Sequence, residues 1–501
     1  MTVLPSDVPA IGRSATMVLD VSVVLRRYGF LGLNGDGTPA TDRLDVRCLE
    51  PGTRISIDAP SLLVADTVGV ELPGLTSRAE VARGFLYDTT RSWFRRRRPQ
   101  YRALCPHVSF SGAGLAPIWI TSDGAAVVAW WTYGGRRHLL VGLDIVQEMV
   151  RYTQGDPSKV DTVKDKSLWG FGHERPLYLY EDNVVAGEET VPWADRLGFL
   201  LVDRLSTAAN LPRLSPLPGG AAGAILLTGD DDQAELTKYA VQQQLLAGFP
   251  ITYLMLPHTR HTPETLATLS SSVEFGVHID ALDRPEDYDA ICDEQTEAVR
   301  QLVGRPARTI RNHGHLNRGY WTHLAAWERN GLTLDFQIRG VDGTCPTGSY
   351  LPFRTRRPDG SWSAHWSLFS TFSDGMFFVQ KWSEEQQIAC ISALAKRIAA
   401  SFPGIIVANF HPQNVESIPN VHRAVMRLGR QPGWIALGGE SYAAWLQARE
   451  DVEVIGDRRG LRLVSANPID KLALIWPGSE APVVLPEWRG EQSVAHSSVP
   501  S

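Results

Sequence analysis

Three consecutive aspartates, Asp230, Asp231 and Asp232, lie in the stretch 228–232, which directly follows the apolar run 224–227. A short apolar run of this kind is typical of a buried β-strand. Adjacent carboxylates at the end of a buried strand repel one another and lose hydration, unless a cation or a proton lies among them. The triplet therefore predicts a metal site. The alternative is a loop in which an aspartate caps the helix that the pattern predicts after residue 233.

Further side chains that could bind a metal or transfer a proton follow other strand-like runs. They are His278 after the run 273–277, Arg311, His313 and His315 after 307–310, and His411 after 405–410. Between these runs, apolar residues recur every three or four positions, as in amphipathic helices, over 285–302 and 388–398. Alternating strands and helices predict a parallel α/β barrel or a wound sheet, whose active site lies at the carboxyl ends of the strands.

The order of these motifs resembles that of the polysaccharide deacetylase superfamily, the NodB-homology or carbohydrate esterase family four type. The motifs are Thr-x-Asp-Asp at 228–231, Glu-x-Gly-x-His at 274–278, an Arg-led motif at 311 and a His near the last strand at 411. The resemblance covers roughly residues 220–448. It implies a distorted (β/α)7 barrel that holds one divalent metal, commonly zinc, and hydrolyses an acetamide or a related amide.

The same resemblance implies a role for each matching residue. Asp230 would be the general base, Arg311 the arginine that orients this base, and His411 the general acid. Asp231 and His278 would be metal ligands.

The chain departs from the family pattern at one ligand. The family has a second histidine four residues after the first, and this chain has Leu282 there. A catalytic zinc site needs three protein ligands and an open position. We favour His313 as the replacement, because it lies two residues after Arg311 at the end of a strand; His315 and Asp280 are the alternatives. Without any replacement, the barrel would bind a glycan and not cleave it.

These residue types suit the hydrolysis of an amide. A divalent cation lowers the pKa of water to about 7 and polarises a carbonyl oxygen. Asp230 could then take a proton from the attacking water, and His411 could protonate the departing amine. We therefore predict removal of an acetyl or related acyl group from an N-acylated amino sugar or its intracellular precursor. Hydrolysis of a non-sugar amide is the alternative.

The composition excludes several other classes. The chain has 501 residues, enough for more than one domain, and a formal net charge of −6, which argues against a general nucleic-acid binder. Its five cysteines are odd in number and form no C-x-x-C pair, which indicates reduced thiols. The sequence shows neither a signal peptide nor a membrane span, so we predict a cytoplasmic location and a small-molecule or carbohydrate substrate.

Changes in composition predict five regions. These are an N-terminal extension (1–54), a non-catalytic α/β domain (55–210), the barrel (220–448), a small β region (450–490) and a disordered tail (491–501). The boundary before the barrel is rich in Pro and Gly. The domain 55–210 faintly resembles a flavodoxin or a class I glutamine amidotransferase. Cys105 lacks the flanking glycines of a catalytic elbow, so we predict no catalysis there.

The basic run Arg95-Arg96-Arg97-Arg98 has two interpretations. It could bind a phosphate, an anionic lipid surface or nucleic acid, or it could be a solvated loop.

The segment 340–375 is rich in aromatic residues and also has two interpretations. It could be a lid over the barrel mouth whose rings stack on a sugar, or its rings could pin a long loop to the core. The residues are Trp362, Trp366, Phe369 and Phe372.

Overall fold

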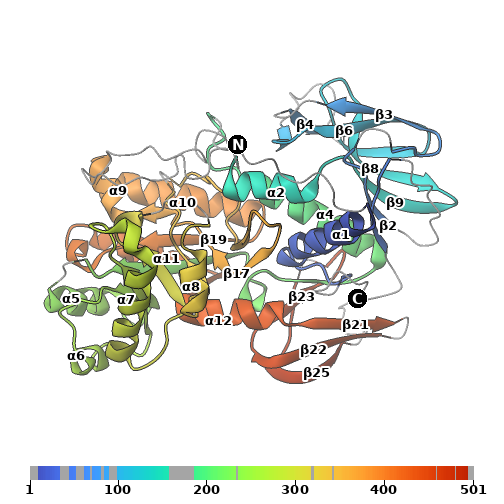
Figure 1. Ribbon diagram of the computed structural model, residues 1–501. Coiled ribbons are helices and arrows are strands. Elements are labelled where there is room, and N and C mark those ends of the chain that lie inside the picture. The colour runs from blue at the N-terminus through green and yellow to red at the C-terminus, as the bar shows by residue number, and fades with distance from the viewer. Residues whose placement is uncertain are drawn as a thin grey trace. The chain divides into compact units, whose positions relative to one another are not determined.

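The computed structural model describes residues 10–33, 45–51, 61–67, 70–80, 84–89, 99–156, 186–232, 235–316, 321–340, 343–457, 460–479 and 481–494 (Figure 1). The described residues form two compact units. One unit takes its residues from Met1–Arg151, Trp193–Gly220 and Ala448–Ser501, and the other from Tyr152–Pro192 and Ala221–Gln447.

In the second unit, parallel strands alternate with helices, and the helices lie around the outside of the strands (Figure 1). The strands pair in the order β16-β17-β15-β14-β13-β12-β11-β19-β18, β20 also pairs with β11, and every pair except β16 with β17 is parallel. The strands are β11 (Gly223–Asp230), β12 (Ile251–Met255), β13 (Val273–Ile279), β14 (Thr309–Asn312), β15 (Leu334–Asp335), β16 (Phe353–Arg356), β17 (Trp362–Ser367), β18 (Phe372–Ser373), β19 (Gly404–Asn409) and β20 (Trp434–Leu437). The helices are α5 (Leu236–Leu246), α6 (Pro263–Ala267), α7 (Tyr288–Val303), α8 (Leu324–Arg329), α9 (Asp374–Val379), α10 (Glu384–Ala400), α11 (Pro419–Gly429) and α12 (Gly439–Glu450).

The segment 362–373 brings the two ends of this strand order together. It begins as β17, which pairs with β15, and ends as β18, which pairs with β19. Between these pairings, Leu368 N donates to Asp335 O (3.0 Å) and Thr371 N donates to Val407 O (2.9 Å). The predicted α/β class is therefore confirmed for this unit, as a curled, half-barrel sheet.

Successive side chains of β11 point to opposite faces of the sheet. Ile225 and Leu227 lie in the large apolar core that also contains Tyr239 of α5. Thr228 and Asp230 therefore point the other way, into the curled sheet. This alternation decides which aspartate of the triplet reaches the site.

In the Glu-x-Gly-x-His motif of β13, Glu274 and Gly276 have structural roles, and His278 lies in the candidate site. Glu274 accepts hydrogen bonds from the backbone N of Glu440 (2.7 Å) and Ser441 (3.2 Å), in the first turn of α12. Gly276 lies against Thr309: a Cβ at this glycine would be 2.2 Å from Thr309 Oγ1. The glycine is required because β13 and β14 approach closely beside the site.

We expect Gly276→Ala to lower the free energy of unfolding by about 1–3 kcal/mol, the usual cost of overpacking, as measured by urea denaturation. Gly439→Ala is the control, because its Cβ would meet no neighbour closer than 3.1 Å. A Gly276→Ala protein as stable as the parent would show that this contact relaxes without cost.

The first unit contains a nine-stranded sheet in the order β1-β2-β9-β8-β7-β4-β5, to which β6 and β3 attach through β8. The pairs β1–β2 and β2–β9 are parallel, and the other pairs in this sheet are antiparallel. The strands are β1 (Asp45–Cys48), β2 (Ser61–Val64), β3 (Leu75–Glu80), β4 (Phe85–Asp88), β5 (Pro99–Arg102), β6 (His107–Gly112), β7 (Leu115–Ile120), β8 (Ala126–Tyr133) and β9 (Arg136–Val141). The helices nearby in sequence are α1 (Ala10–Arg27), α2 (Ile145–Gln154) and α4 (Trp193–Ala209).

This sheet does not confirm the flavodoxin-like prediction for residues 55–210. A flavodoxin-like sheet is parallel, with a helix in each connection. Here β8 and β9 are joined directly through Gly134 and Gly135, which have positive φ values of 57° and 74°. Such a turn makes an antiparallel hairpin and leaves no room for a crossover helix.

Several predicted boundaries differ from the structure. The predicted N-terminal extension includes β1, which pairs with β2 in the sheet. The Pro- and Gly-rich stretch 211–220 includes β10 (Arg213–Leu214), which pairs with β23. The strand β25 reaches Val494, so the predicted disordered tail does not begin at residue 491. The arginine run 95–98 lies outside the described residues.

Residues after 452 contribute to two small antiparallel sheets, β21-β22-β25 and β10-β23-β24. The strands are β21 (Glu453–Asp457), β22 (Gly460–Ile469), β23 (Ala473–Ile475), β24 (Val483–Val484) and β25 (Trp488–Val494). The five cysteines form no disulfide. Among the described helices, none combines the length and the apolar character needed to cross a membrane.

Candidate metal and catalytic site

The polar side chains predicted from strand ends meet at one edge of the curled sheet. Because the carboxyl ends of neighbouring parallel strands lie together, residues that end β11, β13 and β14 or follow β19 come into contact. They line a cavity of about 280 Å³. The predicted or neighbouring residues in its wall are Asp230, Asp232, His278, His313, His315 and His411.

Asp230 is held by Arg311, as predicted for a base and its orienting arginine. Arg311 Nη1 donates to Asp230 Oδ1, and Asn409 Nδ2 donates to Asp230 Oδ2 (2.9 Å). The fully buried arginine also donates through Nη2 to Thr228 Oγ1 (2.9 Å) and Ser370 Oγ (3.0 Å). Burial acts to raise the pKa of Asp230, but the charges of Arg311, His278 and His411 together outweigh it and hold the pKa well below its usual range. Asp230 therefore stays ionised.

Asp231 does not lie with the other predicted ligands. It points toward the helices, on the same side as Leu227, and its Oδ1 accepts a hydrogen bond from the Tyr239 hydroxyl. Burial raises the pKa of Asp231. Since side chains two positions apart share a face, Asp232 rather than Asp231 joins Asp230 in the cavity. This corrects the ligand predicted from the family motif by one residue.

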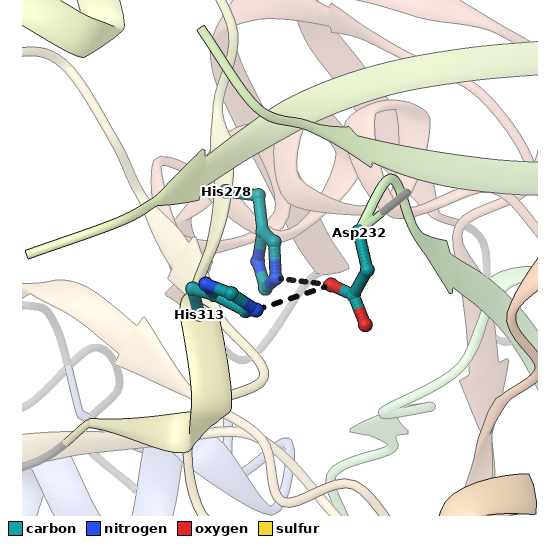
Figure 2. A group of neighbouring side chains, drawn as sticks. All are labelled: Asp232, His278 and His313. Atoms are coloured by element: carbon teal, nitrogen blue, oxygen red, sulfur yellow. Dashed lines mark hydrogen bonds and ion pairs between the residues drawn. The ribbon is translucent and has the colours of Figure 1, made fainter. Parts of the chain in front are cut away.

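Asp232, His278 and His313 form a group of candidate metal ligands. Asp232 Oδ1 lies 3.2 Å from His278 Nε2 and 3.7 Å from His313 Nε2. One ligand atom from each residue lies within 4.8 Å of the others. Figure 2 shows both imidazole rings pointing toward this single carboxylate.

The contacts at Nδ1 turn the Nε2 atoms of the two histidines toward Asp232. His278 Nδ1 lies 2.8 Å from the carbonyl oxygen of Arg311, so Nδ1 carries a proton. His313 Nδ1 lies 3.2 Å from Asp280 Oδ2. Each Nε2 atom faces a carboxylate oxygen, which is an acceptor, so either a proton on Nε2 or a cation must lie between the two atoms.

The spacing also suits a cation such as zinc. Tetrahedral coordination with bonds of about 2.0–2.1 Å places neighbouring ligand atoms about 3.3 Å apart. The separations of 3.2 and 3.7 Å from Asp232 Oδ1 are close to that value. Hydrogen bonding from His278 and the charge of His411 hold the pKa of Asp232 at about 2, against the opposing effect of burial, which raises it. The carboxylate is therefore ready to bind a cation.

The other candidates for the third ligand have different contacts. His315 Nδ1 lies 2.9 Å from the carbonyl oxygen of Gln337, and burial together with Arg311 holds its pKa well below the usual value. Asp280 faces His313 from the far side of the ring, where it can orient that histidine. Leu282 packs against the apolar core. The structure thus groups His313 with His278.

His411 is tied to a residue that the sequence patterns did not single out, Asp374. His411 Nδ1 lies 2.6 Å from Asp374 Oδ1, and the backbone N of His411 donates to Asp374 Oδ2 (2.7 Å). His411 Nε2 lies 3.5 Å from Asp230 Oδ2 and 3.4 Å from Asp232 Oδ2. Burial lowers the pKa of His411, but Asp374 and Asp230 raise it well above the ordinary value. The imidazolium therefore presents a proton at Nε2 inside the cavity.

Asp374 follows β18, which has only two residues. A strand of two residues is too short to show a periodic pattern in the sequence. Asp374 nevertheless lies at the carboxyl end of a strand, as Asp230 does. The residue lies in Phe372-Ser373-Asp374-Gly375, two positions after an apolar residue, and this is the signal that could have found it.

Three of the four aromatic residues named in the segment 340–375 pin that segment to the core, and the fourth, Trp362 at the start of β17, is only partly buried. Trp366, Phe369 and Phe372 are 4%, 1% and 2% exposed. They belong to the curled sheet and to the segment that closes it, so their rings do not face a sugar. The lid interpretation is wrong for these residues.

Comparison with protein-family models and with curated proteins finds no match. Solved structures do match. The chain resembles polysaccharide deacetylases. A Mycobacterium smegmatis structure, described provisionally as a polysaccharide deacetylase, is 18% identical, covers 47% of this chain and 93% of its own, and has a TM-score of 0.36. A probable polysaccharide deacetylase from Pseudomonas aeruginosa is 15% identical, with 48% and 96% covered and a TM-score of 0.35.

A chitin deacetylase from the fungus Colletotrichum lindemuthianum is 11% identical, with 45% of this chain and 87% of that chain covered and a TM-score of 0.28. Likenesses as distant as these do not assign an activity. The function must be argued from the side chains in the cavity.

Proposed function

We propose that this protein is a metal-dependent hydrolase that removes an acetyl or related acyl group from an N-acylated amino sugar. One observation carries the proposal: the Nε2 atoms of His278 and His313 converge on Asp232. The ionised Asp230 and the protonated His411 face the same cavity. A ligand group, a base and an acid are the parts that hydrolysis of an amide needs.

Asp232, His278 and His313 would hold the cation. Two imidazoles and one carboxylate suit zinc and leave an open position. When bound, the ion would supply a Lewis acid that polarises a carbonyl oxygen and makes water a nucleophile at neutral pH.

The chain's own residues would then move the protons. Asp230 accepts a proton from the attacking water, while Arg311 and Asn409 keep its carboxylate in place. The new carbon–oxygen bond forms as the carbon–nitrogen bond breaks, and the electron pair of the broken bond goes to nitrogen. His411 Nε2 gives its proton to that nitrogen, so an amine and a carboxylic acid leave. Asp374 stabilises the imidazolium before transfer.

The proposal is tested by incubating the zinc-loaded protein with oligomers of N-acetylglucosamine and with acetanilide, and measuring acetate and free amine. We expect acetate and amine in equal amounts from the amino sugar, and their loss after chelation. Binding of the oligomer without any acetate would instead identify a glycan-binding barrel. Acetate from acetanilide alone would identify a non-sugar amide as the substrate.

A general acid matters most when the leaving group is poor. We therefore expect His411→Ala to reduce hydrolysis of an acetamide roughly 100-fold or more, and hydrolysis of an activated aryl ester much less. Asp374→Asn should show the same preference with a smaller loss, because it acts through His411. Metal content should stay normal in both variants. Equal losses on both substrates would show that His411 supports the fold or the metal and is not the acid.

A further inference from the structure

An exposed aromatic ring lies in the wall of the cavity. Phe378, on α9, is 41% exposed, an unusual value for a side chain of its size. It follows Asp374 by four positions, so both side chains lie on the same face of this short helix. Both Phe378 and His411, which Asp374 holds, line the cavity. An apolar face is thus fixed next to the proposed acid.

A hydrogen-bond acceptor lies in the same wall. Gln413, in the turn that follows His411, lines the cavity, and its Oε1 is inaccessible to solvent. Within the described part of the chain, this oxygen accepts no hydrogen bond. A buried carbonyl oxygen without a donor is unfavourable. A ligand hydroxyl would satisfy this oxygen once the amide of Gln413 rotates to turn it toward the cavity.

We propose that Phe378 and Gln413 form a subsite for a pyranose ring. This inference rests on the proposed function and specifies its substrate class. One face of a pyranose ring presents C–H groups and its edge presents hydroxyl groups. The ring of Phe378 matches the C–H face, and Gln413 Oε1 accepts from a hydroxyl.

The subsite is tested by binding, measured by calorimetry on the full-length, zinc-loaded protein with a β-1,4-linked tetramer of N-acetylglucosamine. Asp230→Asn serves as the parent, so that the tetramer is not consumed. We expect Phe378→Ala to weaken binding roughly tenfold, because the substitution removes both the apolar contact and the flat face on which a ring can stack. Phe378→Leu should also weaken binding, since it keeps an apolar group and removes the flat face.

Val379→Ala is the matched control. Val379 is 40% exposed on the same helix and is not among the residues that line the cavity. Its replacement should leave the affinity unchanged. Gln413→Ala should weaken binding, and Gln413→Glu, which keeps an acceptor oxygen, should restore part of the loss.

In the protein with Asp230 intact, Phe378→Ala should raise KM for the tetramer, whereas the control Val379→Ala should leave it unchanged. Equal affinity of the parent and the Phe378→Ala variant would overturn the subsite, even if the protein releases acetate. Weaker binding in that variant without acetate release by the wild type would support the subsite and overturn the hydrolase.

Discussion

We expect Asp232→Asn to abolish stoichiometric metal binding and Asp231→Asn to leave it intact. The difference follows from strand alternation. Asp232 Oδ1 is the atom that both imidazoles approach, while Asp231 faces Tyr239 on the opposite side of the sheet. Loss of a charged ligand should exceed the 10–100-fold weakening that is typical when a partner of a ligand is lost.

Metal affinity is measured by competition with a chromophoric chelator, and metal content by elemental analysis after dialysis. Both variants change one carboxylate to an amide, so the comparison isolates position in the chain. Loss of metal from the Asp231 variant alone would restore the ligand that the family motif implies.

The same measurement ranks the histidines. His313→Ala should lose as much affinity as His278→Ala, and His315→Ala should lose less, because His315 lies outside the group of candidate ligands. An equal or larger effect at His315 would move the third ligand there.

We expect Asp230→Asn to reduce turnover roughly 100-fold or more while the metal stays bound. The substitution keeps the size of the side chain and one acceptor oxygen for Arg311, but it removes the group that accepts the proton. Asn409 and Arg311 already fix Asp230, so the loss reflects proton transfer and not position. The measurement is kcat on an N-acetylated amino sugar, with metal content determined on the same sample. Unchanged turnover would make Asp230 a structural partner of Arg311.

The sequence predicted the residues that follow long, apolar strands. Asp230, His278, Arg311 and His411 come together because parallel strands end at one edge of a sheet, and this rule needs only the strand pattern. The choice between Asp231 and Asp232 needs more, because it depends on the face to which each side chain turns. The motif match uses only the order of residues in the sequence, so it does not show to which face of the sheet each side chain points.

Other features escaped prediction for different reasons. Asp374 follows a strand of two residues, which no periodic pattern can reveal. The antiparallel pairs of the first unit depend on whether a turn joins neighbouring strands directly, and short apolar runs look alike in parallel and antiparallel sheets. Cavity residues such as Phe378 lie on a short helix, where exposure is decided by packing that only the structure shows.

The most direct test of the central claim is a single titration. Metal-free protein is mixed with increasing zinc, and acetate release from a tetramer of N-acetylglucosamine is measured at each step. Acetate release should rise with zinc and saturate at one ion per chain, and the Asp232→Asn protein should stay inactive at the same zinc concentrations. Equal acetate release by metal-free and zinc-loaded protein, or none from either, would contradict a metal-dependent deacetylase.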